Sequence, residues 1–151
     1  MSIEPSAGIF VGREHRLAVR VYYEDTDFTG VVYHGAYVRF FERGRSDGLR
    51  VAGVMHADLL AAADPAAFTV TRLAIDFVRA ARIDDALIVR TLFEQVKGPR
   101  LIIRQSITRG EEIISHAEVE AACIRPDGRV RRPPPELAGR LAPYLETPRA
   151  P

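Results

Sequence analysis

Hydrophobic and polar residues alternate within residues 15–24, the first stretch of the chain with a regular pattern. Strand side chains point alternately to the two faces of a sheet, so a period of two predicts a half-buried strand here. Tyr23 falls on the same side of this pattern as Leu17, Val19 and Val21. The pattern therefore predicts that the Tyr23 ring faces the core.

The spacing of apolar residues becomes that of a helix from about Gly35 to about Val51. The apolar stripe contains Ala36, Tyr37, Phe40 and Phe41. Because the stripe is wide and aromatic, we expect this helix to be buried along its length against a flat surface. Gly44 lies on the same stripe. A glycine costs a helix about 1 kcal/mol relative to alanine, so it indicates a close approach to a neighbouring backbone.

Small residues dominate positions 54–67, and they predict a short helix that ends at Pro65. Four strand-like segments follow, separated by short turns: about 68–79, 86–96, 100–109 and 112–125. Connections this short join antiparallel neighbours, whereas parallel strands need long crossovers. The element order therefore predicts an α+β fold. In this fold an antiparallel five-stranded sheet, with its last four strands in a meander, wraps around one long central helix.

Seven of the ten prolines lie at or after position 126, where they disfavour regular structure. A short turn near Glu136 to Leu141 is the one exception that we expect there. The sequence thus divides into an N-terminal extension (residues 1–14), one globular domain (residues 15–126) and a proline-rich C-terminal tail (residues 127–151).

The overall charge argues against some kinds of partner. The chain has 21 basic and 20 acidic residues and a net charge of +1, so no global field attracts nucleic acid or an anionic membrane.

Its single cysteine, Cys123, excludes an internal disulfide and a zinc site built on cysteine pairs, and it fits a reducing compartment. The first residues do not resemble a signal peptide, and no apolar stretch is long enough to span a membrane. We therefore expect a cytoplasmic protein without an integral membrane segment.

A polar cluster lies where the first strand should end. Residues 25–29, Asp-Thr-Asp-Phe-Thr, match the D-x-D-x-T loop of magnesium-dependent haloacid-dehalogenase-type phosphatases, in which one aspartate is the nucleophile. That loop follows a parallel strand covered on both faces and precedes alternating helices and strands. Here the preceding strand is half polar and no crossover helices follow, so the context disfavours a phosphatase.

A longer run carries a more specific pattern. Residues 20–37 read RVYYEDTDFTGVVYHGAY, and the pattern continues in residues 40–45 (FFERGR), 77–85 (FVRAARIDD) and 117–119 (AEV). Over roughly residues 16–130 the chain resembles the 4-hydroxybenzoyl-CoA thioesterase family, in particular its YbgC-like, Tol-Pal-associated acyl-CoA thioesterases. The resemblance implies the hotdog fold, hydrolysis of an acyl-CoA to free acid and thiol, no metal and no organic cofactor.

The same resemblance assigns roles to individual residues. It places Asp27 at the catalytic carboxylate, as nucleophile or general base, and His34 and Tyr23 at the other polar positions. If the helix starts near His34, the amides of His34 and Gly35 are the candidate oxyanion donors, and Gly30 and Gly35 allow a tight path. Structural alternatives exist: Asp27 fits an Asx turn, His34 the start of a helix, and Tyr23 a packing role.

Coenzyme A carries phosphates, which arginine and lysine side chains bind well. The resemblance points to Arg82, Lys97 and Arg100 as candidate CoA-binding residues. An acyl carrier protein is a possible alternative substrate carrier. The resemblance further implies a homo-oligomer, a dimer or a tetramer, with the active site at a subunit interface.

Two other functions remain open at this point. One is a hotdog hydratase or dehydratase acting on an acyl thioester, and the other is a non-catalytic acyl-CoA-binding protein. No histidine among His15, His56 and His116 has a partner at metal-ligand spacing, so we expect these three to be structural or exposed.

Overall fold

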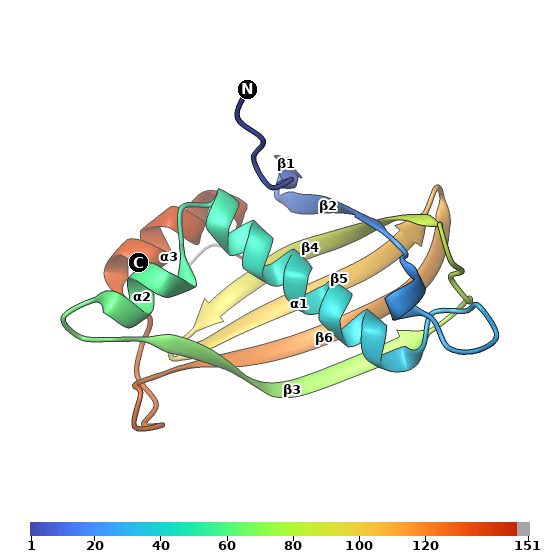
Figure 1. Ribbon diagram of the computed structural model, residues 1–151. Helices are drawn as coiled ribbons and strands as arrows, with labels where there is room; N and C mark the ends of the chain where they lie inside the picture. The colour runs from blue at the N-terminus through green and yellow to red at the C-terminus, as the bar shows by residue number, and fades with distance from the viewer. Residues whose placement is uncertain (148–151) are drawn as a thin grey trace.

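The long helix α1 (His34–Val51) lies against one face of a single antiparallel sheet, as Figure 1 shows. The computed structural model describes residues 1–147. Six strands form the sheet in the order β1-β2-β4-β5-β6-β3. Their bounds are Ile9–Val11 (β1), Glu14–Arg20 (β2), Ala67–Phe77 (β3), Ala86–Lys97 (β4), Arg100–Arg109 (β5) and Glu112–Ile124 (β6). The predicted α+β arrangement of an antiparallel sheet around one long helix is therefore confirmed.

The sheet has one strand more than the five that the sequence predicts. The additional strand is β1, which lies inside the predicted extension of residues 1–14 and pairs with β2. Gly12, with φ of 62°, makes the turn between these two strands. Since β1 is three residues long, no alternating pattern can reveal it.

The last four strands do not form a meander. β4, β5 and β6 are neighbours in sequence order, but β3 pairs with β6 at the far edge of the sheet. Residues 78–85 therefore cross the end of the sheet between β3 and β4. These eight residues can span about 27 Å, whereas three interstrand spacings amount to about 14 Å. The connection is therefore long enough to pass β6 and β5. A connection of this length could equally join two neighbouring strands, so the sequence does not distinguish the two arrangements.

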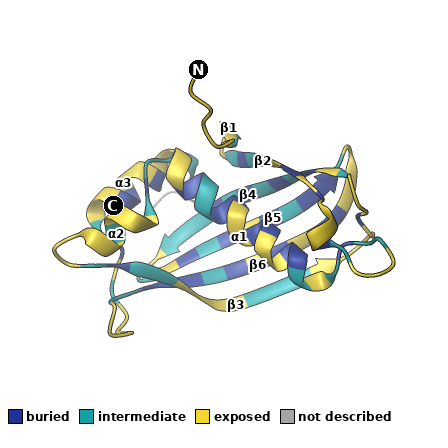
Figure 2. Cartoon of the chain, viewed as in Figure 1, coloured by how far each residue is buried: buried dark blue, intermediate teal, exposed yellow. Residues whose placement is uncertain are grey.

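The buried side of α1 packs against β2, β4 and β5, with its polar side facing outward (Figure 2). Phe41 is fully buried, as is Phe93 of β4. At Gly44 a Cβ atom would lie 2.6 Å from Cγ1 of Val89 and 3.0 Å from Oγ1 of Thr91. The close approach predicted at Gly44 is therefore real, but it is made to side chains of β4 rather than to a backbone.

The segment after residue 126 contributes to the core. Its helix α3 (Pro135–Leu141) begins at a proline, which suits a first helical turn because that position needs no N–H donor. Leu137, Leu141 and Leu145 are buried, and the 3₁₀ helix η2 (Ala142–Tyr144) stacks the Tyr144 ring on Phe10. The structure thus has a packed helix where the sequence predicts a turn; Pro148 and Pro151 lie outside the described residues.

The predicted short helix before β3 is α2 (His56–Ala61).

A buried histidine fastens the start of the chain to α1. His15 is completely buried, and its Nε2 atom lies 2.7 Å from Oδ2 of Asp47. The same carboxylate oxygen accepts a hydrogen bond from the Gly8 amide at 2.8 Å. The structural role predicted for His15 agrees with this arrangement.

We expect Asp47→Ala to destabilise the fold by about 1–3 kcal/mol, because it leaves a buried imidazole and a backbone amide without their acceptor. Equilibrium denaturation in urea measures the change. Glu111→Ala is the control: Glu111 is exposed, and its replacement should change the free energy of unfolding by less than about 0.5 kcal/mol. Equal effects of the two substitutions would show that the His15–Asp47 contact adds nothing.

Candidate active site

A tight turn joins the end of β2 to the start of α1. The chain leaves the sheet through the 3₁₀ helix η1 (Tyr23–Asp25) and then folds back on itself, with a bridge between Thr26 and Val32. Gly30, with φ of 81°, occupies the left-handed region that a side chain would disfavour. The tight path predicted at Gly30 is therefore confirmed, and the helix starts three residues after this turn.

Asp27 occupies the first position of this turn and is exposed. Its Oδ1 atom accepts two hydrogen bonds from Thr29, one from the amide at 2.7 Å and one from the hydroxyl at 2.6 Å. These bonds, the hydroxyl bond above all, hold the pKa of Asp27 below its ordinary value. Asp27 thus forms the Asx turn expected of its sequence context, and it is ionised at neutral pH with Oδ2 unpartnered among residues 1–147.

Two amides at the N-terminus of α1 have no acceptor among the described residues 1–147. The first helical hydrogen bond from this end runs from the Ala36 amide to the Tyr33 carbonyl oxygen, at 3.0 Å. Tyr33 makes no side-chain cap, and the first turn has no acidic residue. Within the part of the chain that the structure describes, the amides of His34 and Gly35 therefore have no acceptor. Free amides and the helix dipole together favour a negatively charged oxygen at this point.

The His34 side chain borders an apolar hollow of about 330 Å³ between α1 and β3. Tyr37, one helical turn further on, forms its floor together with Phe77 of β3. The Tyr37 hydroxyl accepts a hydrogen bond from the Ala81 amide at 3.1 Å, which ties residues 78–85 to the helix. The sequence indicates Tyr37 only as a core residue; no pattern reveals that it also lines a hollow.

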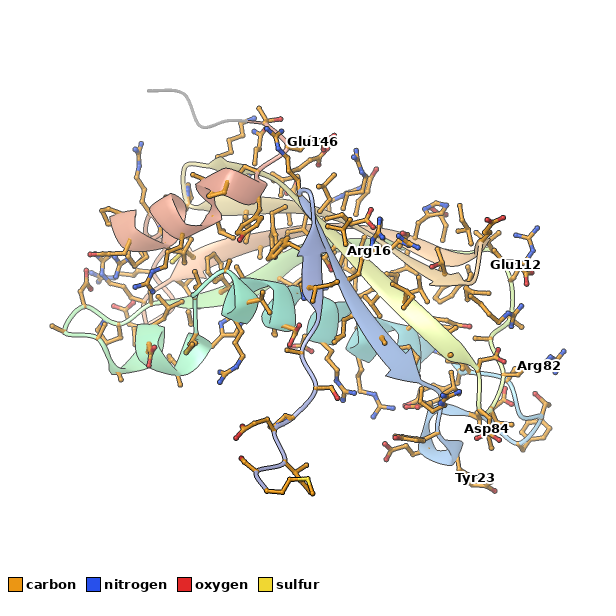
Figure 3. All side chains as sticks on the ribbon, turned by 90° about the horizontal axis from the view of Figure 1, so that it is seen from above. Arg16, Tyr23, Arg82, Asp84, Glu112 and Glu146 are labelled. Carbon is orange, nitrogen blue, oxygen red and sulfur yellow. The ribbon has the colours of Figure 1, made fainter. Side chains whose placement is uncertain are left out.

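The prediction for Tyr23 is wrong: its side chain is 83% exposed. β2 ends at Arg20, and the Val21 amide donates to the Asp85 carbonyl oxygen, so the alternation stops before position 23. Figure 3 shows the Tyr23 side chain at the edge of the molecule, pointing outward. By contrast, Asp25 is buried and accepts a hydrogen bond from the Tyr22 amide at 2.8 Å.

The structure brings one of the three candidate CoA-binding residues to this site. Arg82 pairs with Val31 across the turn, and its side chain is exposed at the same end as Tyr23 (Figure 3). Lys97 and Arg100 instead face each other at the opposite end of β4. That strand has 12 residues and is about 37 Å long. One chain therefore cannot place all three on the neighbouring phosphates of a single CoA.

Within residues 1–147 no group of three His, Cys, Asp or Glu side chains is arranged to hold a metal ion. Nε2 of His56 lies 3.5 Å from the Ser46 hydroxyl, and Nδ1 of His116 lies 3.4 Å from Oδ2 of Asp76.

None of the helices in the described part of the chain has the length and apolar character needed to cross a bilayer.

Comparison with known proteins assigns the family. The family model of the thioesterase superfamily matches residues 29–115. The acyl-CoA thioesterase YbgC of Haemophilus influenzae is 45% identical over 106 residues, which cover 70% of this chain and 77% of that protein. The chain belongs to the thioesterase superfamily. His34, Gly35 and Arg82 lie within the matched residues of this thioesterase, whereas Tyr23 and Asp27 precede them.

Further relatives agree with this assignment. The acyl-CoA thioester hydrolase YbgC of Escherichia coli O6:H1 is 39% identical to this thioesterase over 112 residues, 74% of this chain and 82% of that protein. A crystal structure of a probable thioesterase from Bartonella henselae superimposes with a TM-score of 0.78 and 41% identity, covering 80% of this chain and 99% of that chain. The hotdog architecture implied by the sequence is shared with this thioesterase structure.

Proposed function

We propose that this thioesterase hydrolyses acyl-CoA thioesters, as the names of its YbgC relatives indicate for those proteins. The observation that carries the proposal is the N-terminus of α1, where two amides without an acceptor among residues 1–147 follow the turn that holds an ionised Asp27. Thioester hydrolysis needs both parts. A carboxylate attacks the acyl carbon or activates water, and fixed donors stabilise the oxyanion that develops.

In the proposed reaction the thioester oxygen lies between the amides of His34 and Gly35, with the acyl group in the hollow beside His34. The Asp27 carboxylate then removes a proton from water as the water oxygen bonds to the acyl carbon. Alternatively, it bonds to that carbon itself and forms a mixed anhydride, which water hydrolyses to the acid and free Asp27 after the thiol has left. The C–S bond breaks, the sulfur receives a proton, and the products are a carboxylic acid and CoA thiol. The His34 ring borders the hollow, which suits it to orienting the substrate.

We assign the CoA phosphates to Arg82 of the same chain and to Lys97 and Arg100 of a second copy. This division follows from the length of β4, which separates the two groups within one chain. Tyr23, exposed at the same end as Arg82, is likewise free to meet a ligand held by two copies. An acyl carrier protein carries the same thioester and is the alternative substrate.

The test of this function is thiol release from a panel of acyl-CoAs and acylated carrier proteins. Release of thiol supports the thioesterase. Hydration of an enoyl thioester without thiol release would instead support a hydratase or dehydratase, and saturable binding without turnover would support a non-catalytic acyl-CoA-binding protein.

We expect the protein to be a homodimer or homotetramer. β3 is an edge strand, and Val70 and Phe77 on it are 46% and 54% exposed. An uncovered apolar edge invites pairing with another strand. Sedimentation equilibrium should give two or four times the chain mass of 16.8 kDa. A monomer at micromolar concentration would contradict both this assembly and the shared phosphate site.

Thr29 should control the acid limb of the pH profile. Its hydroxyl stabilises the charged form of Asp27, so Thr29→Val should raise the pKa of Asp27 and move the acid limb of kcat/KM to higher pH. A carbon-13 NMR titration of the Asp27 carboxyl follows the same shift directly. Thr26→Val is the matched control, because the Thr26 hydroxyl donates to the Tyr23 carbonyl instead. An unchanged Asp27 titration in Thr29→Val would refute the assignment.

A further inference from the structure

Asp25 is a buried carboxylate that the proposed reaction does not use. It lies two residues before Asp27 and is 7% exposed. Its Oδ2 atom accepts the hydrogen bond from the Tyr22 amide, and its Oδ1 atom lies 3.7 Å from Nη2 of Arg39. Among residues 1–147, Arg39 is the only basic side chain that forms an ion pair with it. The hydrogen bond and the ion pair together compensate the burial of this charge.

The backbone of Asp25 holds the residue from which α1 starts. Its carbonyl oxygen accepts a hydrogen bond from the Tyr33 amide at 3.2 Å. Tyr33 is the N-cap of α1 and directly precedes His34 and Gly35, whose amides the proposed reaction uses. Because planar peptide units join these residues, fixing the Tyr33 nitrogen restricts where the two amides can lie.

Arg39 connects the same carboxylate to the second turn of α1. It lies five residues after His34, the first residue of the helix. Its guanidinium carbon is 5.8 Å from the centre of the Tyr33 ring, a distance typical of a cation–π contact. Asp25 therefore holds α1 at two points, at its start through the Tyr33 amide and in its second turn through Arg39.

The Tyr33 ring lies against Gly35. A Cβ atom at Gly35 would lie 2.7 Å from Cε2 and 3.3 Å from Cδ2 of this ring. The absence of a side chain at Gly35 thus lets the ring pack directly on the backbone that carries one of the two amides. A displacement of the ring, which Arg39 contacts from another side, therefore changes the packing of Gly35.

The chain that follows Asp25 carries the other half of the site. Thr26 forms a bridge with Val32, and the Asp27 amide donates to the Val31 carbonyl oxygen at 2.9 Å. Asp25 is therefore linked to Asp27 along the chain and to the start of α1 through its own contacts. The distance between the Asp27 carboxylate and the two amides depends on Asp25, and a misplacement of 1 Å at a reacting centre costs on the order of 100-fold in rate.

We propose that Asp25 is a positioning residue which, together with Arg39, sets the distance between the Asp27 carboxylate and the amides of His34 and Gly35. This inference rests on the proposed function and adds two residues to its site. Neither residue touches the reacting atoms in the proposed reaction. The oxyanion develops only in the transition state, so their loss should lower kcat and leave KM nearly unchanged.

The test measures kcat and KM for thiol release in Asp25→Asn, Arg39→Met and the double variant, with the acyl-CoA that the wild-type protein hydrolyses fastest. Asparagine can still accept the hydrogen bond from the Tyr22 amide, but it lacks the charge that pairs with Arg39. We expect each single substitution to lower kcat by about 10-fold and to change KM by less than about twofold. The double variant should be no slower than the slower single variant, because both substitutions remove the same interaction.

Each variant has a matched control nearby. Glu24 is an exposed carboxylate next to Asp25, and Arg43 is an exposed arginine one turn after Arg39 on the same helix. Glu24→Gln and Arg43→Met change the same charges without these contacts, so kcat should stay within about twofold of the wild-type value.

An infrared spectrum of bound substrate separates positioning from a general loss of structure. The Asp27→Asn protein, in which hydrolysis is slow, is loaded with an acyl-CoA that carries carbon-13 at the thioester carbonyl. Hydrogen bonds from the two amides lower the stretching frequency of this carbonyl. Adding Asp25→Asn or Arg39→Met should reverse part of that shift, whereas Arg43→Met should leave it unchanged.

Two results would overturn the proposal while leaving acyl-CoA hydrolysis intact. One is a wild-type kcat in folded Asp25→Asn and Arg39→Met, and the other is a carbonyl frequency that neither substitution changes. Arg39→Met decides the matter if Asp25→Asn does not fold, because the Arg39 side chain is 56% exposed. If the wild-type protein releases no thiol from any acyl-CoA, the proposed function fails and this inference fails with it.

Discussion

Replacing Asp27 by asparagine is expected to lower kcat/KM for acyl-CoA hydrolysis by about 10²–10⁴-fold, the usual contribution of a general base. Asparagine retains an oxygen that can accept both hydrogen bonds from Thr29, so the turn should persist while the negative charge is lost. The measurement is thiol release under second-order conditions, with circular dichroism to confirm that the variant is folded.

A matched control separates catalysis from a general effect of charge. Asp58 is an exposed aspartate of α2, and Asp58→Asn should leave kcat/KM within about twofold of the wild-type value, as expected of a surface change remote from the site. If Asp27→Asn is as active as Asp58→Asn, then Asp27 serves only its Asx turn and another group must activate the nucleophile.

Gly44→Val should be the most destabilising of the substitutions considered, at about 3 kcal/mol. A Cβ at this position already lies 2.6 Å from Val89 and 3.0 Å from Thr91, and the valine methyl groups add to that overlap. Overpacking of this kind forces the helix away from the sheet. For a chain of this size the loss corresponds to a fall in Tm of about 6–12 °C, which differential scanning calorimetry measures.

Gly139→Val is the control for this substitution. Gly139 lies in the helix α3, and a Cβ there meets no atom within 4 Å. Both variants carry the same change in helix propensity, so the difference between their Tm values isolates the contact of α1 with β4. Equal Tm values would show that the helix approaches the sheet less closely at Gly44 than the structure indicates.

Local patterns in the sequence predict the long elements well. The helical stripe around Phe40 and Phe41 gives α1, and the short turns give the strands from β3 to β6 to within about two residues. Gly30 and the start of α1 at His34 could also be predicted, because a glycine in a turn and a helix terminus are local features.

Features that depend on distant contacts could not be predicted in this way. In the sequence Tyr23 continues the alternating pattern of β2, but the strand ends before it, where the Val21 amide donates to the Asp85 carbonyl. No residue near Val21 in the sequence predicts this hydrogen bond. The place of β3 beside β6 likewise depends on how residues 78–85 cross the sheet. Lys97 is a suitable phosphate ligand by chemistry, and only the length of β4 shows how far it lies from Arg82 within one chain.

The crossing of residues 78–85 over the end of the sheet has a consequence for folding. The Ala81 carbonyl accepts a hydrogen bond from the Val32 amide, and the Ile83 amide donates to the Gly30 carbonyl. The turn that carries Asp27 is therefore held by a segment some 50 positions later in the chain. Contacts of such high sequence separation form slowly and late. Regained activity should therefore mark the end of refolding rather than its beginning, with catalysis absent from any intermediate in which β3 has not yet docked.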